Sequence, residues 1–137
     1  MIGISVITHG LMAEGVLDSL KLIMGEQDNI SVLGLHEGDE MESFKESIFN
    51  KVQEVSDGNG VLVFVDLFGA SPFSTTGSLV PRFLENNIDV RVITGCNLPM
   101  LLEAASMRHG MSLSELYKSI IETGKESILE LRDTFNI

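Results

Sequence analysis

The fold is decided by the stretch Gly60-Val-Leu-Val-Phe-Val65, the most hydrophobic strand-like segment of the chain. Its near-continuous apolar character is typical of a strand that is buried on both faces, as in the middle of a parallel sheet. A polar residue, Asp66, follows it directly, and Ser71-Pro72 then opens a helix, with Ser71 suited to the N-cap and Pro72 to the first helical position. This stretch therefore predicts one strand–loop–helix unit of an α/β protein.

The rest of the chain is predicted to contain the same strand–loop–helix unit three more times. Short β-branched segments predict further strands, and apolar residues at helical spacing predict the helices between them. The expected strands are Ile2–Ile7, Ile30–Leu35, Gly60–Val65 and Ile88–Thr94, and the expected helices are Leu11–Met24 ending at Gly25, Glu40–Val55, one from Ser71, Leu98–Met107, and one from the capping box Ser112-Leu-Ser-Glu115 to Gly124. Four alternations predict an open, mostly parallel sheet with helices on both faces. The segment Glu126–Arg132 fits either a helix or a short strand.

Length, composition and charge exclude several classes of protein. With 137 residues and 44 % hydrophobic residues, the chain is expected to form one domain, 1–137, with a proper core. Its net charge of −11 argues against nucleic acid and anionic membranes as partners, and it fits attraction to basic proteins. A single cysteine, Cys96, excludes an intramolecular disulfide and is expected to be a small buried apolar residue. With no signal peptide and no membrane-spanning run, the expected location is the cytoplasm.

Sites in such folds lie beyond the carboxyl ends of the strands, where the strand order reverses. His9 follows the first strand and Asp66 follows the third, so the two side chains would lie side by side at the switch point if these strands are neighbours. A histidine can act as nucleophile, base or metal ligand, and a nearby carboxylate can hold one ring nitrogen as N–H and leave the other as a nucleophile. The structural alternatives are a rim or helix-capping role for His9 and an N-cap or loop turn for Asp66.

A phosphoryl group is one cargo that a nucleophilic histidine could carry. The distribution of Lys and Arg along the chain indicates how such a group would be held. No Lys or Arg occurs before Lys21, and none occurs between Lys51 and Arg82. The group would therefore rest on backbone N–H groups at the starts of two helices, an anion site common in this fold. Four small residues leave room for it: Gly10, Gly69, Ala70 and Ser71.

The sequence lacks the residues that several other kinds of site require. The sequence has no P-loop, no G-x-G-x-x-G after the first strand and no G-x-S-x-G elbow. Near His9 only Asp66 qualifies as a further metal ligand, so neither a metal site nor a cofactor is expected. His36 and His109 are expected to lie on surface loops.

Five segments together resemble the EIIA component of the mannose family of the bacterial phosphoenolpyruvate:sugar phosphotransferase system. The resemblance covers essentially the whole chain, and the combination is specific although no single segment would be. The segments are Ile7-Thr-His-Gly10, Gly25-Glu-Gln, Val65-Asp-Leu-Phe-Gly-Ala-Ser-Pro-Phe73, Gly95-Cys-Asn-Leu-Pro-Met100 and Glu122-Thr-Gly-Lys125.

This resemblance implies a phosphohistidine carrier, a transferase component of sugar uptake. His9 matches the family's phosphorylated histidine, with phosphate expected on its tele nitrogen; Asp66 matches the orienting carboxylate, and Ser71 a serine beside the site. The donor would be the carrier protein HPr, the acceptor a histidine of an EIIB domain, and the membrane components EIIC and EIID would complete sugar uptake. The family is homodimeric and exchanges a C-terminal antiparallel edge strand, which favours a strand at Glu126–Arg132.

The chain departs from the family pattern at one point. Better-known members often carry Thr-Trp-Gly-Gly where this chain has Leu67-Phe-Gly-Ala70, so no hydroxyl is available at position 67. Because the sequence ends at Ile137, no fused EIIB domain is expected.

Four alternative functions compete with this one. A receiver domain would need an acidic pair where Thr8-His9 stands, and a phosphohistidine mutase would need an arginine in place of Thr8. A phosphocarrier for dihydroxyacetone kinase and a non-catalytic flavodoxin-like binding or regulatory domain are the remaining alternatives.

Overall fold

Strand β3 (Val61–Val65) lies inside the sheet and sends its side chains alternately into two separate cores, because successive residues of a strand point to opposite faces. The computed structural model describes residues 1–137. Leu62 and Phe64 pack into one core, whereas Val61, Val63 and Val65 pack into the other. All five side chains are fully buried, as the uninterrupted apolar sequence predicts.

The sheet has four parallel strands in the order β2-β1-β3-β4. The other three are β1 (Gly3–His9), β2 (Ile30–Leu35) and β4 (Val90–Ile93). The chain moves from β1 to one side for β2 and to the other side for β3, so the strand order reverses between β1 and β3. The carboxyl ends of these two strands thus form the topological switch point.

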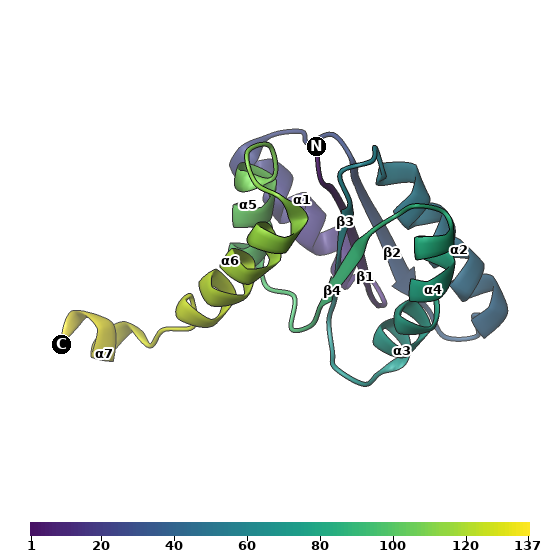
Figure 1. Ribbon diagram of the computed structural model, residues 1–137. Helices are drawn as coiled ribbons and strands as arrows, with labels where there is room; N and C mark the ends of the chain where they lie inside the picture. Colours follow the sequence, from purple (N-terminus) through teal and green to yellow (C-terminus); the bar gives the residue numbers. More distant parts are fainter.

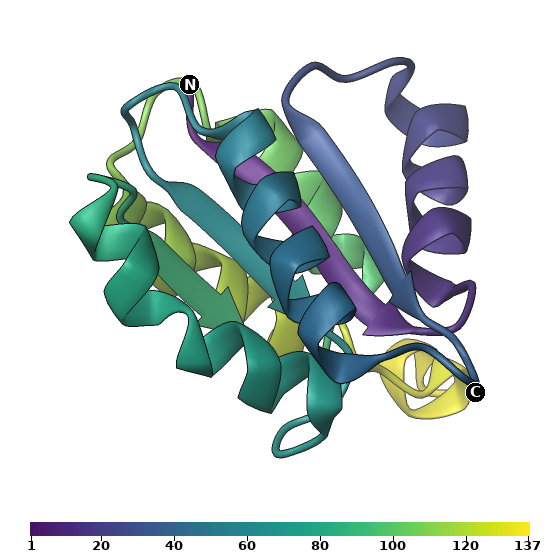
Figure 2. The same ribbon diagram turned by 90° about the vertical axis from the view of Figure 1, so that its right-hand side faces the viewer.

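Helices cover both faces of the sheet (Figures 1 and 2). The core on one face is completed by α1 (Met12–Met24), α5 (Leu98–Met107) and α6 (Leu113–Glu126), and the core on the other face by α2 (Met41–Val55), α3 (Ser71–Ser78) and α4 (Val80–Glu85). The open parallel α/β fold is confirmed, and so are the capping box that starts α6 and the end of α1 at Gly25.

Three local predictions need correction. The segment after Asp66 forms two helices instead of one, because Pro81 lies at the start of α4 and lacks the N–H that a continuous helix would need. Ala70, not Ser71, is the N-cap of α3. Helix α6 continues past Gly124, whose missing side chain lets Met100 of α5 pack closely against it.

The C-terminal segment forms no fifth strand in the single chain. Residues 128–130 are irregular, and a short helix, α7 (Leu131–Phe135), follows with its first turn capped by the Glu130 carboxylate. Figure 1 shows α7 apart from the sheet, where no strand is available for pairing. The expected edge strand therefore stays a prediction about an assembly of two chains.

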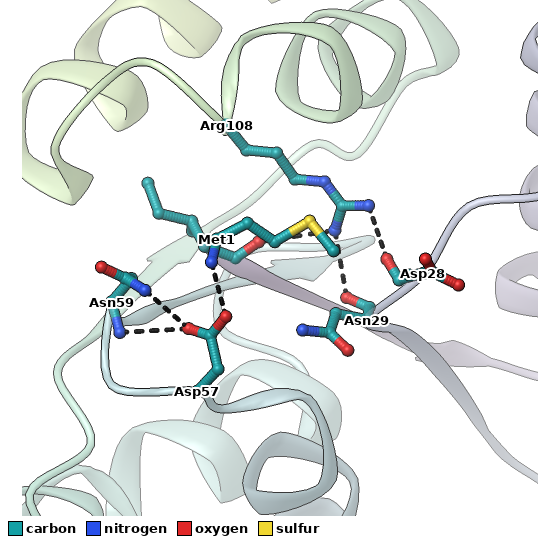
Figure 3. Close-up of polar contacts among 7 residues, drawn as sticks. Met1, Asp28, Asn29, Asp57, Asn59 and Arg108 are labelled. Carbon is teal, nitrogen blue, oxygen red and sulfur yellow. Dashed lines mark hydrogen bonds and ion pairs between the residues drawn. The ribbon is translucent and has the colours of Figure 1, made fainter.

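The end of the sheet opposite the switch point is tied together by Arg108. Figure 3 shows its guanidinium reaching the backbone carbonyl groups of Asp28 and Asn29, at 2.5 and 3.2 Å. A longer bond of 3.4 Å reaches the carbonyl of Ile2. Burial lowers the pKa of Arg108, and the charges of Asp28 and Asp57 oppose that shift. The buried side chain thus links the residue before β1, the α1–β2 connection and the end of α5.

Candidate functional site

His9 is the last residue of β1 and lies at the switch point. It pairs with Leu35 of β2, and the next residue, Gly10, donates its backbone N–H to the Leu35 carbonyl at 2.7 Å. Gly10 has a φ of 55°, a left-handed conformation that glycine adopts without steric cost. The chain can therefore turn sharply after His9 into α1 and leave the imidazole at the edge of the sheet.

Asp66 lies beside His9, as expected if the first and third strands are neighbours, which the sheet order confirms. Its Oδ2 accepts a hydrogen bond from the His9 backbone N–H at 2.9 Å and lies 2.7 Å from His9 Nδ1. The His9 side chain is 49 % exposed, whereas that of Asp66 is 13 % exposed. The carboxylate is thus held against the protein while one side of the imidazole faces solvent.

The pairing determines which ring nitrogen is reactive. A carboxylate only accepts hydrogen bonds, so Nδ1 must carry the proton in the Asp66 contact. A neutral imidazole has one N–H and one lone pair, and the lone pair then lies on Nε2. The arrangement presents Nε2 as a nucleophile on the side of the ring away from Asp66.

The surroundings keep the Asp66 carboxyl group charged. Partial burial raises its pKa, but hydrogen bonds from the His9 backbone and ring outweigh that effect, so the pKa of Asp66 lies below its usual value. Its second oxygen, Oδ1, is buried and accepts no hydrogen bond within the chain. The charged form of Asp66 is therefore sustained by His9.

Of the four small residues predicted to hold phosphate, Gly10 follows His9 and the other three lie on the loop that leaves Asp66. Gly69 has a φ of 81°, Ala70 is the N-cap residue of α3 without a capping side-chain bond, and Ser71 is the first residue of that helix. None of these three residues hydrogen-bonds to His9. Pro72 has no N–H, so the start of α3 offers fewer backbone donors than an ordinary helix start.

The sequence interpretation missed an apolar rim around the pair. Leu11 and Met12 follow His9-Gly10 and are 67 % and 44 % exposed, and Leu67 and Phe68 follow Asp66 and are 59 % and 75 % exposed. The Phe68 ring packs against Phe73, with ring centroids 4.7 Å apart. Four large apolar residues placed directly after the two polar residues were the available signal.

The structure also brings a distant cation toward this end of the sheet. Lys125 of α6 borders a hollow of about 460 Å³ whose wall includes Phe68 and the β4 residue Ile93. Sequence spacing alone could not place Lys125 there, because more than fifty residues separate it from Phe68. Lys125 has no hydrogen bond to His9 or Asp66, and its ammonium group lies 3.9 Å from Glu122.

The remaining candidates take the places predicted for them. Cys96 is buried, with a backbone bond to Val65, and burial together with the Asp66 charge raises the pKa of its thiol to about 12. His36 and His109 are exposed. Among the three histidines, only the His9 ring contacts a carboxylate.

The switch point of this open parallel α/β domain presents a half-exposed histidine oriented by a carboxylate, the arrangement that a histidine nucleophile needs. The sequence model of a protein family described as "PTS system fructose IIA component" matches residues 3–121. The chain therefore belongs to the EIIA family of fructose- and mannose-type phosphotransferase systems.

Individual relatives agree with this assignment. The mannose-specific EIIAB component of Escherichia coli K12 is 32 % identical over 132 residues, which are 96 % of this chain and 40 % of the relative. The chain thus spans about two fifths of that protein's length. The phosphotransferase system component EIIA of Streptococcus agalactiae has a TM-score of 0.86 and 28 % identity over 95 % of this chain and 97 % of its own.

A second solved structure supports the same family. The PTS IIA protein associated with the fucose utilization operon of Streptococcus pneumoniae has a TM-score of 0.82 and 31 % identity, over 97 % of this chain and 95 % of its own. None of the helices described here has the length and apolar character needed to cross a bilayer.

Proposed function

We propose that this chain is a phosphohistidine carrier of a sugar phosphotransferase system, which accepts a phosphoryl group on Nε2 of His9 from HPr and passes it to a histidine of an EIIB domain. The observation that carries the proposal is the 2.7 Å contact between His9 Nδ1 and the Asp66 carboxylate. That contact leaves Nε2 unprotonated and exposed, as a nucleophile for phosphorus must be.

The transfer is a displacement at phosphorus. The Nε2 lone pair of His9 forms a new N–P bond while the N–P bond of the donor breaks, and its electron pair returns to the donor imidazole. The phosphorylated His9 ring keeps its Nδ1 proton and carries more positive charge than before. Asp66 stabilises that charge, and it lies on the ring side away from the phosphoryl group, where its repulsion of phosphate is weakest.

Phosphate would be held on His9 by neutral groups. Gly10, Gly69, Ala70 and Ser71 are the proposed small residues of this cradle, and backbone N–H groups at the starts of α1 and α3 are the proposed donors. No cation is bonded to the His9–Asp66 pair. A cradle of this kind stabilises bound phosphate only moderately, which suits a group that must be passed on.

The surface around His9 suits a protein partner better than a small molecule. Apolar side chains surround the pair, and exposed apolar groups in contact patches stabilise protein complexes. The net charge of −11 favours association with basic partners. HPr and EIIB are the proposed direct partners, and EIIC and EIID would be reached only through EIIB.

We further propose that the protein forms a homodimer by exchange of its C-terminal segment. Strand β4 has a free edge, and the 460 Å³ hollow lies beside it. The segment after α6 carries five exposed apolar residues, which a second copy could cover: Ile128, Leu129, Leu131, Phe135 and Ile137. Pairing of this segment with β4 of the second copy, as an antiparallel strand, would bury these residues. It would also satisfy the unpaired backbone N–H and C=O groups along the free edge of β4.

Phosphorylation of His9 is tested by intact-protein mass measurement. The protein is incubated with phosphoenolpyruvate, enzyme I and HPr, and the wild type is expected to gain one phosphoryl group that is stable in base and lost in acid. His9→Gln should gain none, because the nucleophile is gone. His109→Gln is the matched control, since it removes an exposed histidine remote from Asp66, and it should be labelled like the wild type.

Two outcomes would contradict the proposal. Labelling that survives His9→Gln would place the phosphoryl group elsewhere, with His36 as the next residue to test. Labelling that hydroxylamine removes would indicate an acyl phosphate on Asp66, as in a receiver domain.

A further inference from the structure

Thr8 immediately precedes His9, and it is fully buried at the end of β1. Its hydroxyl group donates a hydrogen bond to the His9 carbonyl oxygen at 3.1 Å. The same oxygen, Oγ1, accepts the backbone N–H of Ala13 in the first turn of α1, at 2.9 Å. One side chain thus joins the strand that carries His9 to the helix that follows it.

The Thr8 bond completes a set of contacts on the His9 main chain. Asp66 accepts the His9 N–H, Thr8 donates to the His9 carbonyl, and the Leu35 carbonyl accepts the N–H of Gly10. Three successive backbone groups are therefore fixed by three different partners. Rotation about the His9 backbone would break at least one of these bonds, so the ring stays over Asp66.

The Ala13 bond fixes the start of α1 relative to His9. The first N–H groups of a helix have no partner within the helix, and at α1 no N-cap side chain provides one. Thr8 takes the place of that cap from four residues before the helix begins. The sharp turn at Gly10 makes this contact possible, because it brings α1 back over the end of β1.

We propose that Thr8 is a positioning residue for phosphoryl transfer, which holds His9 in register with Asp66 and fixes the start of α1 beside the ring. This inference rests on the phosphocarrier function proposed above. Thr8 lies below the site and is closed to solvent, so it acts through His9 and α1 and has no contact with a partner protein. Both hydrogen-bonding capacities of its hydroxyl group are used, which valine, of nearly the same shape, cannot reproduce.

The test compares Thr8→Val with Thr8→Ser, which keeps the hydroxyl group and loses only the methyl. Thr76→Val is the matched control, because Thr76 is equally buried on α3 and its hydroxyl group has no partner. Two quantities are measured for each folded variant: the tautomer of the unphosphorylated His9 ring from its ¹⁵N chemical shifts, and kcat and KM for phosphoryl transfer from phospho-HPr.

Thr8→Val is expected to lower kcat by roughly ten- to a hundredfold, since small errors in the placement of reacting groups have effects of that size. KM should change little, because Thr8 lies outside the partner surface. The single Nδ1–H tautomer of the wild type should become a mixture. Thr8→Ser should restore both properties, and Thr76→Val should match the wild type in both.

A purely structural role for Thr8 would give a different result. Thr8→Val would then be less resistant to urea, yet its folded form would keep one tautomer and the wild-type kcat, and that outcome would overturn the proposal. If Thr8→Val does not fold, Thr8→Ala at low temperature gives the same comparison. If the wild type itself accepts no phosphate, the phosphocarrier function fails, whereas the effect of Thr8 on the tautomer is still decided by NMR.

Discussion

Asp66 uses one of its two carboxylate oxygens for both bonds to His9 and leaves the other buried without a partner. Hydrogen bonds to a charged acceptor are stronger than neutral ones, so Oδ2 determines how the imidazole is oriented. At the scale of single residues, the proposed reactivity of His9 therefore depends on the charge of Asp66.

Asp66→Asn is expected to keep the fold and to slow phosphoryl transfer markedly. An amide can donate to Nδ1 as well as accept from it, so the ring tautomer is no longer fixed and part of the population carries its proton on Nε2. The measurement is the rate of transfer from phospho-HPr at neutral pH, with circular dichroism to check the fold. A rate equal to that of the wild type would mean that Asp66 is only a structural cap.

The same pair makes stability depend on pH. Folding lowers the pKa of Asp66, so the charged carboxylate stabilises the folded state. This contribution is fully present above the pKa of an unfolded aspartate, about 3.9. It is lost as the pH falls through the lower pKa of the folded protein. The gap in urea unfolding free energy between wild type and Asp66→Asn should therefore shrink as the pH falls below about 4.

At the scale of elements, the close approach of β2 to the turn after β1 supports the site. Gly34 pairs with Thr8, and a Cβ at Gly34 would collide with the Gly10 carbonyl oxygen. A backbone atom cannot move aside as the end of a flexible side chain can. The turn that carries His9 into α1 thus depends on a glycine in the neighbouring strand.

Gly34→Ala is expected to lower both stability and transfer rate, the stability by about 1–3 kcal/mol, typical of overpacking. Gly3→Ala is the matched control: a Cβ there would collide with the Val55 carbonyl oxygen at the opposite end of β1. It should destabilise the protein similarly and leave transfer by the folded protein unchanged. Equal effects of both variants on transfer would show that Gly34 supports only the sheet.

At the scale of the whole molecule, the two ends of the sheet serve different purposes. Arg108 ties the amino ends of the strands through backbone carbonyl groups, and the carboxyl ends hold the exposed His9–Asp66 pair and the apolar rim. The free edge of β4 and the apolar C-terminal segment are unpaired in one chain, which is why a second copy is proposed to cover them.

The dimer is tested by light scattering after size-exclusion chromatography. The wild type is expected at twice the mass of one chain, and Ile128→Asp at the mass of one, because Ile128 borders the hollow beside β4 and a buried carboxylate is costly. Leu22→Asp is the control: Leu22 is 89 % exposed on α1, so this variant should stay dimeric. A monomeric wild type at micromolar concentrations would contradict the proposal.

Local chemistry explains why much of the fold could be predicted. The apolar run Val61–Val65 must be buried on both faces, the α6 capping box satisfies its own backbone groups, and Gly25 ends α1 because glycine tolerates its φ of 80°. The break between α3 and α4 was missed although Pro81 marks it. The course of α6 past Gly124 could not be predicted, because it depends on Met100 of another helix.

The sequence by itself determined the parallel α/β fold and the choice of His9 and Asp66 as candidates, since strand ends and residue types are local properties. That the two side chains meet follows from β1 and β3 being neighbours, which the tertiary structure decided. Only the tertiary structure decided that Thr8 and Gly34 support His9, that Lys125 lies near Phe68, and that Arg108 links the amino ends of the strands. These contacts join residues through hydrogen bonds and close approaches between elements, and such distances follow from packing rather than from spacing along the chain.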